Sequence, residues 1–339
     1  MKKQQSGFTL VELMVAMAIG LSVVAGATQL LISSQQSYRF QTALANMQDN
    51  GRFALDTLTR ELRQTAYYGA CAPSQTTVHL HTTADSGTPS PALKAWRDID
   101  SSALASTLLN PVADQDSLMF RGAPFARTGF VSESLQIDSV DNSQQLTLNR
   151  SLDNLFSNQL VLLQGLQSCD IFYNTSGVAT SLQKDPTAGW QSNLAGSVSP
   201  WGKVSGLSYS AGQTVSLSAL NSAFYYIGQD PDNDNAPSLM RLDLSQTTPR
   251  NEVLASHVAA MRATFLVEQA YLAADQISDA EWAEVSALRI SLIVQSDQAN
   301  VRPEPTTISA GNFRGDNVFN ADPGRLYQAF TTTIALRNR

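Results

Sequence analysis

The chain has 339 residues, 43% of them hydrophobic and 15% charged, and a formal net charge of −7. This length and apolar content suffice for one large domain or two small ones with a core. The acidic balance argues against direct nucleic-acid binding, which needs clustered lysine and arginine.

The N-terminal segment carries the most specific pattern. Lys2, Lys3 and a polar stretch end at Gly7, and an apolar run extends over residues 8–32. At helical rise these residues span roughly 37 Å, which is enough to cross a hydrocarbon layer of about 30 Å. Glu12 lies inside the run, where a carboxylate costs on the order of 3 kcal/mol, so it needs a partner.

The helical pattern continues beyond the apolar run, through residues 33–67. Apolar residues recur there at three- and four-residue steps, with charged residues between them. The apolar positions are Phe40, Leu44, Met47, Ala54, Leu55, Leu58 and Leu62. No proline occurs before Pro73, so the pattern predicts one helix over residues 8 to about 66, roughly 90 Å long.

The remaining residues, 68–339, are predicted to form a head of short, mostly alternating strands separated by Gly, Pro, Ser, Asn and Asp clusters. The predicted strands are 78–81, 117–121, 145–149, 159–164, 170–173, 224–228, 238–243, 261–268, 288–295 and 329–336. Ser278 and Glu281 form a capping-box pattern that predicts a brief helix. The fold class is therefore α+β, a long N-terminal helix packed on a large antiparallel β-rich head.

Three long loops are expected, over residues 82–115, 174–203 and 296–325. Loops of this length serve as binding surfaces or simply cover the surface.

Two cysteines occur, Cys71 and Cys169. Because the apolar N-terminal segment predicts export, an oxidising compartment and a single disulfide are expected. Free buried thiols are the alternative, since the sequence does not show how far apart the two residues lie.

Motifs for catalysis are absent from the sequence, so no catalytic residue and no cofactor are predicted. The three histidines are His79, His81 and His257, and neither G-x-S-x-G nor H-E-x-x-H occurs. His79 and His81 share one face of a predicted strand, but two imidazoles without a third ligand are more typical of ordinary strand residues than of a metal site.

A weak calcium candidate is formed by Asp230, Asp232 and Asp234, which resemble the start of a calcium-binding loop. The glycine expected at the sixth position is missing, and Arg241 stands where a bidentate glutamate belongs. The alternative is an acidic hairpin loop between the strands 224–228 and 238–243.

The order Gly7-Phe8-Thr9-Leu10-Val11-Glu12 resembles the type IV prepilin leader. That resemblance implies that residues 1–7 are a leader, that a prepilin peptidase cuts between Gly7 and Phe8, and that the new Phe8 amine is methylated. It also implies that Glu12 pairs with the Phe8 amine of a neighbouring subunit. The alternatives are a secretory signal with a cleavage site at residues 25–27, or a plain membrane anchor.

Short sequence motifs farther along the chain resemble those of PilW-type minor pilins of the type IV pilus, so that the resemblance extends over essentially the whole chain. These motifs lie at residues 67–71, 225–228, 237–241, 287–292 and 330–339. Met240 departs from the family motif, which usually has an aromatic residue at that position.

The resemblance implies a structural subunit without enzymatic activity, part of a tip or priming complex that initiates pilus assembly and presents a tip adhesin. Expected partners are other minor pilins, the major pilin, the adhesin, the prepilin peptidase and the inner-membrane assembly platform. The chain is expected in the inner membrane, with one span and a periplasmic head, and then at the pilus tip, where it would serve twitching motility, attachment or DNA uptake. The alternatives are a J-type pseudopilin of a type II secretion system and an anchored or exported envelope enzyme.

Overall fold

The fold was analysed in a computed structural model of the chain. The residues described are 9–68, 71, 77–80, 92–99, 104–124, 133–141, 144–152, 156–166, 168–186, 193, 201, 209–301, 321–322 and 324–336. Gly7, Phe8 and His81, which the sequence analysis singled out, lie outside these residues.

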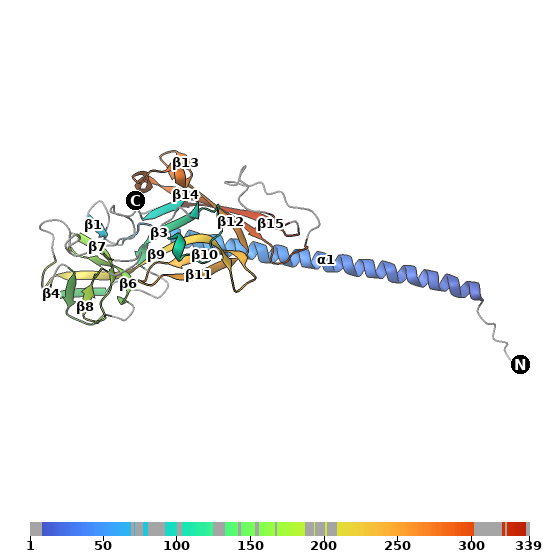
Figure 1. Cartoon of the computed structure of the whole chain (residues 1–339), viewed down its shortest axis with the longest axis horizontal. Helices are drawn as coiled ribbons and strands as arrows, with labels where there is room; N and C mark the ends of the chain where they lie inside the picture. The colour runs from blue at the N-terminus through green and yellow to red at the C-terminus, as the bar shows by residue number, and fades with distance from the viewer. Residues whose placement is uncertain are drawn as a thin grey trace.

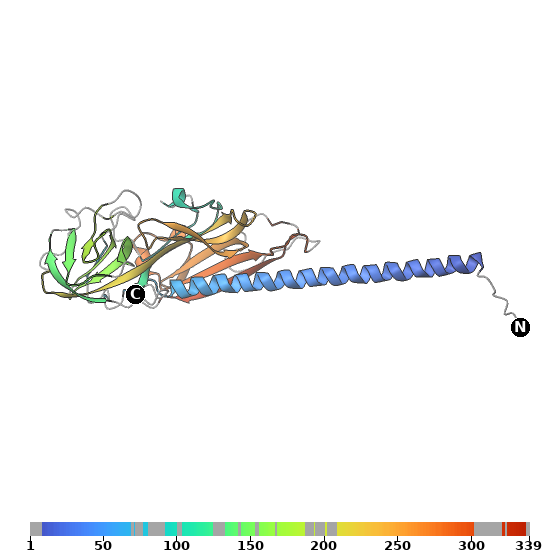
Figure 2. The same cartoon turned by 90° about the horizontal axis from the view of Figure 1, so that it is seen from below.

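One long helix, α1 (Leu10–Leu62, 53 residues), extends far beyond the head toward the N-terminus (Figures 1 and 2). It confirms the predicted helix and ends four residues before the expected position. Its residues up to Gln41 are exposed, and an 18-residue window in this part has a mean hydropathy of 2.1, as expected of a membrane span. The second half buries one stripe against the head, listed as Ala43, Met47, Gly51, Ala54, Thr57, Leu58 and Leu62.

An 11-stranded sheet makes up most of the head. Its strands are β1 (Thr77–Leu80), β2 (Leu93–Trp96), β3 (Ser117–Pro124), β4 (Glu133–Val140), β5 (Gln145–Leu148), β6 (Gln159–Gln164), β7 (Ser168–Asn174), β8 (Ser181–Gln183), β9 (Thr214–Asp230), β10 (Ala236–Asp243) and β11 (Arg250–Ser256). The path β1-β7-β6-β9-β4-β5-β8 is joined by β3 with β2 and by β10 with β11. All pairs are antiparallel except β1 with β7.

The 17-residue strand β9 runs through the whole head. Residues 214–219 pair with β4 and β6, and residues 220–230 pair with β3 and β10. We call β1, β4–β8 and residues 214–219 the distal lobe, because it lies at the end of the head away from the free end of α1 (Figure 1).

A second sheet of four antiparallel strands packs on α1. Its order is β13 (Ala270–Leu272), β12 (Val258–Val267), β14 (Ala287–Gln295) and β15 (Tyr327–Ala335). Contacts of α1 with β11, β14 and β15 place the helix against both sheets. At Gly51 the approach is close, because an added Cβ would lie 2.5 Å from the Phe330 ring of β15.

Two main cores follow from this arrangement. The larger core lies where α1, the four-stranded sheet and the strands around residues 220–230 of β9 meet, and includes Leu58, Leu118, Phe265 and Ile290. The distal lobe has its own core, with Phe172, Leu182 and Trp201 at its centre. Burying each large side chain of this kind contributes roughly 1.5–3 kcal/mol.

Several strands differ from the prediction. The short strands β2 and β8 lie within regions predicted to be loops, while β4, β11 and β13 were not predicted at all. β9 begins ten residues before the predicted strand 224–228. The predicted brief helix is a 3₁₀ helix at Glu281–Glu284, and the Ser278 hydroxyl and N–H donate to the Glu281 carboxylate at 2.7 and 2.8 Å.

A buried arginine joins the end of α1 to the large sheet. Arg241 of β10 is 1% exposed, and its Nε lies 3.5 Å from the carboxylate of Glu61 in the last turn of α1. The hydroxyl of Tyr225 in β9 donates a hydrogen bond to the same carboxylate. The end of the helix is therefore held by groups from two adjacent strands.

Arg241 also pairs with groups on its own sheet. Its Nη1 lies 3.1 Å from Glu252 and 3.3 Å from Asp243, and its Nη2 donates to Asn221 Oδ1 at 2.9 Å. Burial by itself lowers the pKa of Arg241, but the surrounding acidic groups, led by Asp243, raise it above its ordinary value. One guanidinium thus neutralises several carboxylates.

The Arg241→Met substitution should destabilise the fold by about 3–5 kcal/mol, because it leaves the carboxylates of Glu61, Glu252 and Asp243 without their cation. Denaturant unfolding of the full chain in detergent measures the loss. Arg250→Met, at an exposed position of β11, is the matched control and should change stability by less than about 0.5 kcal/mol. Equal stability of the two variants would contradict a stabilising role for the Arg241 cluster.

A disulfide joins Cys71, after α1, to Cys169 in β7, as predicted. The S–S distance is 1.99 Å, the two Cα atoms lie 6.1 Å apart, and 98 positions separate the residues in the sequence. Both cysteines are buried beside Leu160, Leu162 and Ile171. The bond therefore ties the segment that leaves the helix to the distal lobe.

Replacing both Cys71 and Cys169 by serine should lower the free energy of unfolding by about 4–5 kcal/mol, because the bond closes a loop of this length in the unfolded chain. Urea unfolding of the full chain, with and without a reducing agent, checks the value. Reduction should affect the native protein and leave the double variant unchanged. Two alkylatable thiols in the exported native protein would contradict the prediction.

Candidate functional site

The N-terminal end of α1 is closed by a capping box between Thr9 and Glu12. The Glu12 N–H donates to Thr9 Oγ1 at 3.3 Å, and the Glu12 carboxylate accepts from the N–H and the hydroxyl of Thr9, both at 3.1 Å. This arrangement satisfies two helix-end donors and places a negative charge at the positive end of the helix dipole. This cap was not predicted from the sequence, although the T-x-x-E spacing of Thr9 and Glu12 is its signature.

The neighbourhood of Glu12 is apolar and exposed. Leu10, Val11, Leu13 and Met14 are each more than half exposed, so this surface is uncovered in the isolated chain. Thr9, the partner of the Glu12 carboxylate among the described residues, is neutral and leaves its charge uncompensated. In a low-dielectric environment such a charge favours a nearby cation strongly.

Two hydroxyl groups in the apolar run are satisfied within the helix. Ser22 Oγ donates to the Ala18 carbonyl at 2.9 Å, and Thr28 Oγ1 donates to the Val24 carbonyl at 2.8 Å. Such bonds to the preceding turn let hydroxyl groups enter a hydrocarbon layer at low cost. Glu12 is the one ionisable side chain among residues 9–32, and in a low-dielectric environment its carboxylate would be stabilised by a cation from another molecule.

The acidic segment at residues 230–235 is a hairpin turn between β9 and β10, which agrees with the alternative to a calcium loop. Asp230 pairs with Ala236, and Asp230 Oδ1 accepts the Asp232 N–H at 3.0 Å. Asp234 and Asn235 have positive φ of 49° and 52°. Across the described residues no group of three or more His, Cys, Asp or Glu side chains is placed to hold a metal.

The distal lobe contains a buried ionisable cluster that the sequence did not reveal. Tyr209 OH donates to Asp170 Oδ2 at 2.5 Å, and Lys184 Nζ lies 4.7 Å from the centre of the Trp201 ring. Burial lowers the pKa of Lys184 to about 8, against the opposing effect of Asp170, and burial also raises the pKa of Tyr209 well above its ordinary value. Because all four side chains are buried, the cluster belongs to the interior of the lobe rather than to a substrate site.

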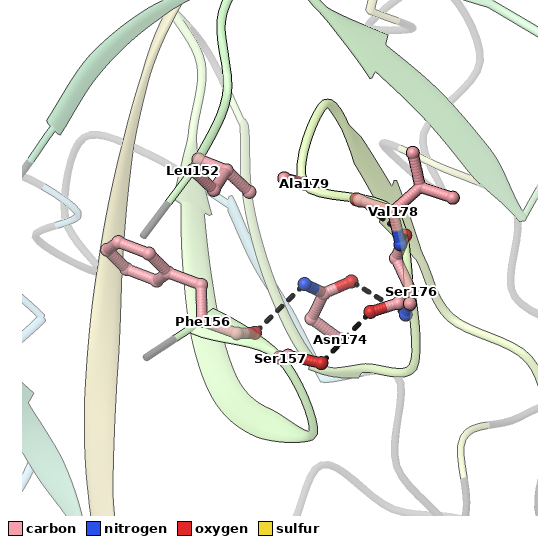
Figure 3. Close-up of a pocket in the computed structure, with 8 residues that line it drawn as sticks. Leu152, Phe156, Ser157, Asn174, Ser176, Val178 and Ala179 are labelled. Atoms are coloured by element: carbon pink, nitrogen blue, oxygen red, sulfur yellow. Dashed lines mark hydrogen bonds between the residues drawn. The ribbon is translucent and has the colours of Figure 1, made fainter. Parts of the chain in front are cut away.

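A small cavity of about 80 Å³ lies in the same lobe, with Leu152, Phe156 and Ser157 on one side and the turn that joins β7 to β8 on the other (Figure 3). Asn174 Nδ2 donates to the Phe156 carbonyl at 2.9 Å, and Asn174 Oδ1 accepts the Ser176 N–H at 3.2 Å. Ser157 Oγ donates to the Ser176 carbonyl at 3.1 Å. The lining residues carry no ionisable side chain, and these hydrogen bonds hold the two loops together.

Comparison with known protein families gave two matches. The model for the prokaryotic N-terminal methylation motif matches residues 2–28, and the model for the type IV pilus-assembly protein W matches residues 224–338. Comparisons with curated proteins and with solved structures gave no match. Residues 29–223, which include the whole distal lobe, lie outside both matched regions, although the sequence resemblance was expected over essentially the whole chain.

A match to the N-terminal methylation motif, one long apolar helix and an antiparallel β-rich head together give the chain a type IV pilin-like architecture. The match from residue 224 onward covers the part of the head that packs on α1. Within its class, the chain therefore matches the PilW type of minor pilin.

The buried Lys184 should make the stability of the head rise with pH. Because its pKa is about 8 in the folded chain and about 10.4 when unfolded, the unfolded state binds more protons between these values, and unfolding becomes harder as pH increases. From pH 8 to 9.5 the gain should be roughly 1–2 kcal/mol. Unfolding of the full chain across this range measures it.

Lys184→Met should remove this rise, whereas Lys94→Met, at a partly exposed position on β2, should keep it. Identical pH profiles for the native chain and Lys184→Met would contradict the assignment. Above about pH 10 the raised pKa of Tyr209 acts in the opposite direction, because the unfolded tyrosine loses its proton first.

Proposed function

We propose that this type IV pilus minor pilin acts in the tip or priming complex, where it helps to initiate assembly and presents an adhesin. The main support for this proposal is the arrangement of the chain. A membrane-type helix lies at one end, and the distal lobe, which the family model does not match, lies at the other (Figure 1). An anchored subunit of this shape presents the distal lobe away from the membrane. The chain acts by binding other proteins and not as an enzyme.

Maturation follows from the leader. A prepilin peptidase removes residues 1–7, and the Phe8 amine that remains is methylated, consistent with the matched methylation motif. Pairing with the Phe8 amine of a neighbouring subunit supplies a cation to the Glu12 carboxylate, whose partner among the described residues is the neutral Thr9.

Localisation changes with assembly. Before assembly the chain spans the inner membrane once with its head in the periplasm, and the Cys71–Cys169 disulfide is what an oxidising compartment favours. The assembly platform then inserts it among other minor pilins and the major pilin. The exposed apolar residues of α1 leave the lipid and pack against neighbouring helices, which keeps them out of water.

The alternatives are less well supported. A J-type pseudopilin of a type II secretion system would share the leader and helix, but the match from residue 224 onward is to a pilus-assembly family. An envelope enzyme would need a nucleophile with an adjacent base in an accessible cleft. The Lys184–Asp170–Tyr209 cluster is buried in the interior of the distal lobe, and the small cavity beside Asn174 is lined by no ionisable side chain.

The Glu12→Ala substitution should leave leader cleavage intact and reduce surface pili by roughly 10- to 100-fold, because docking loses a charge pair in low dielectric. Cells that lack the native copy are complemented with the variant, and N-terminal sequencing, membrane level and surface pili are compared. Ser22→Ala is the control within the same segment, since its hydroxyl bonds only to its own helix.

Two results would count against the proposal. A mature N-terminus at Thr28 in place of Phe8 would indicate a secretory signal and not a prepilin leader. Normal piliation with correctly processed Glu12→Ala protein would show that the carboxylate has no role in assembly.

A further inference from the structure

The last strand of the head is a long edge strand. β15 lies at the end of the four-stranded sheet and pairs with β14 in one unbroken register over nine residues. Among the residues that the structure describes, no strand pairs with its second edge. Its sequence, YQAFTTTIA, contains neither a charged residue nor a proline.

The backbone donors of that second edge can be assigned. The Leu336 N–H donates to the Ser286 carbonyl at 2.9 Å, on the side of β14. Because successive amides of a strand point to opposite edges, the amides of Thr331, Thr333 and Ala335 point to the unpaired edge. The side chains of these three residues are exposed.

The other edge strands have features that natural proteins use to prevent an edge from pairing with another chain. β8 and β13 have three residues each, and β1 and β2 have four. β11 is longer, but it carries Arg250 and Glu252 and its pairing with β10 has a register shift. β15 has none of these features, which indicates that its edge is covered in the assembled protein.

A second copy of this chain does not fit as the occupant. Two identical edges that pair by two-fold symmetry do so with antiparallel strands. Because α1 packs along the sheet that contains β15, the same symmetry would point the two helices in opposite directions (Figure 2). Two copies anchored in one membrane by their N-terminal segments point the same way.

We propose that the free edge of β15 binds an extended segment of a different pilus protein, which adds to the four-stranded sheet as a fifth strand. The main-chain groups of Thr331, Thr333 and Ala335 supply the hydrogen bonds, as in other cases of strand addition. Since β15 lies inside the matched family region, it provides a contact separate from the distal lobe. The inference rests on the proposed membrane anchoring and pilus assembly.

The proposal can be tested by crosslinking in cells that contain the full chain and the other pilus proteins. A photoreactive residue replaces Ala335 in one strain and Val253, an exposed residue of the charged edge strand β11, in a control strain. After irradiation, mass spectrometry identifies the adducts. Position 335 should give an adduct with another pilus protein, and position 253 should not give that adduct.

Backbone and side-chain effects are separated at Thr333. Thr333→Pro removes one outward donor and leaves the ladder with β14 intact, since proline is tolerated at such edge positions. The proline variant should reduce the amount of adduct about tenfold, because a carbonyl of the bound segment loses the Thr333 N–H as its donor. Thr333→Ala keeps this N–H and should change the amount of adduct less than about twofold. Thr333→Lys, which keeps the amide but adds an edge charge, serves as the second variant should the proline variant be unstable.

Each outcome decides between specific alternatives. An adduct between two copies of this chain, or no adduct in cells with processed protein and normal pili, would overturn the proposal. Equal adduct levels for Thr333→Pro, Thr333→Lys and Thr333→Ala would also overturn it. Absence of the chain from purified pili together with a strong, proline-sensitive adduct would instead overturn the proposed pilus function and leave strand addition standing.

Discussion

The burial of one stripe of α1 against the head is the contact on which the rest of the structure depends. The same helix is apolar on all sides near its N-terminus and amphipathic from Ala43 onward. Because only the second half finds a partner within the chain, the first half remains exposed and needs either lipid or other helices. One continuous helix therefore joins a stable head to a segment that is stable only in an assembly.

The head is built to hold that helix at a fixed position. Arg241 neutralises carboxylates from α1, β10 and β11, so that charge balance in the interior requires all three elements to be in place. Buried ion clusters of this kind add little net stability, but they penalise any arrangement that separates their members. The cluster therefore serves the specificity of helix docking, while the apolar core supplies the main driving force.

Coupling between the two parts of the head comes from β9 and the disulfide. β9 contributes to the core next to α1 and to the core of the distal lobe, and Cys71–Cys169 connects the exit of the helix to β7. A load applied to the distal lobe would pass to α1 through main-chain hydrogen bonds and one covalent bond. Such a connection suits a subunit that is proposed to carry a partner at its far end.

Features that depend on local sequence were predicted well. The helix was located within a few residues at its C-terminal end, because a period of 3.6 residues and the absence of proline are properties of the segment itself. The strands β6 and β10 were recognised as short segments between turn-forming residues, and β6 was placed with the correct ends. The prepilin motif and Glu12 are likewise readable from adjacent residues.

Non-local features could be decided only by the tertiary structure. The first residues of β9, rich in serine and small side chains, are a strand because β4 and β6 pair with them, and the three-residue strand β8 exists only beside β5. Arg241 was noted in the sequence only as a residue that does not fit a calcium loop, whereas the structure places it in β10, facing carboxylates more distant in sequence. The sequence by itself determined the prepilin-type motif, the long helix and the possibility of one disulfide. Which residues meet in the interior, and which strand is left with an open edge, depended on long-range pairing that no single segment encodes.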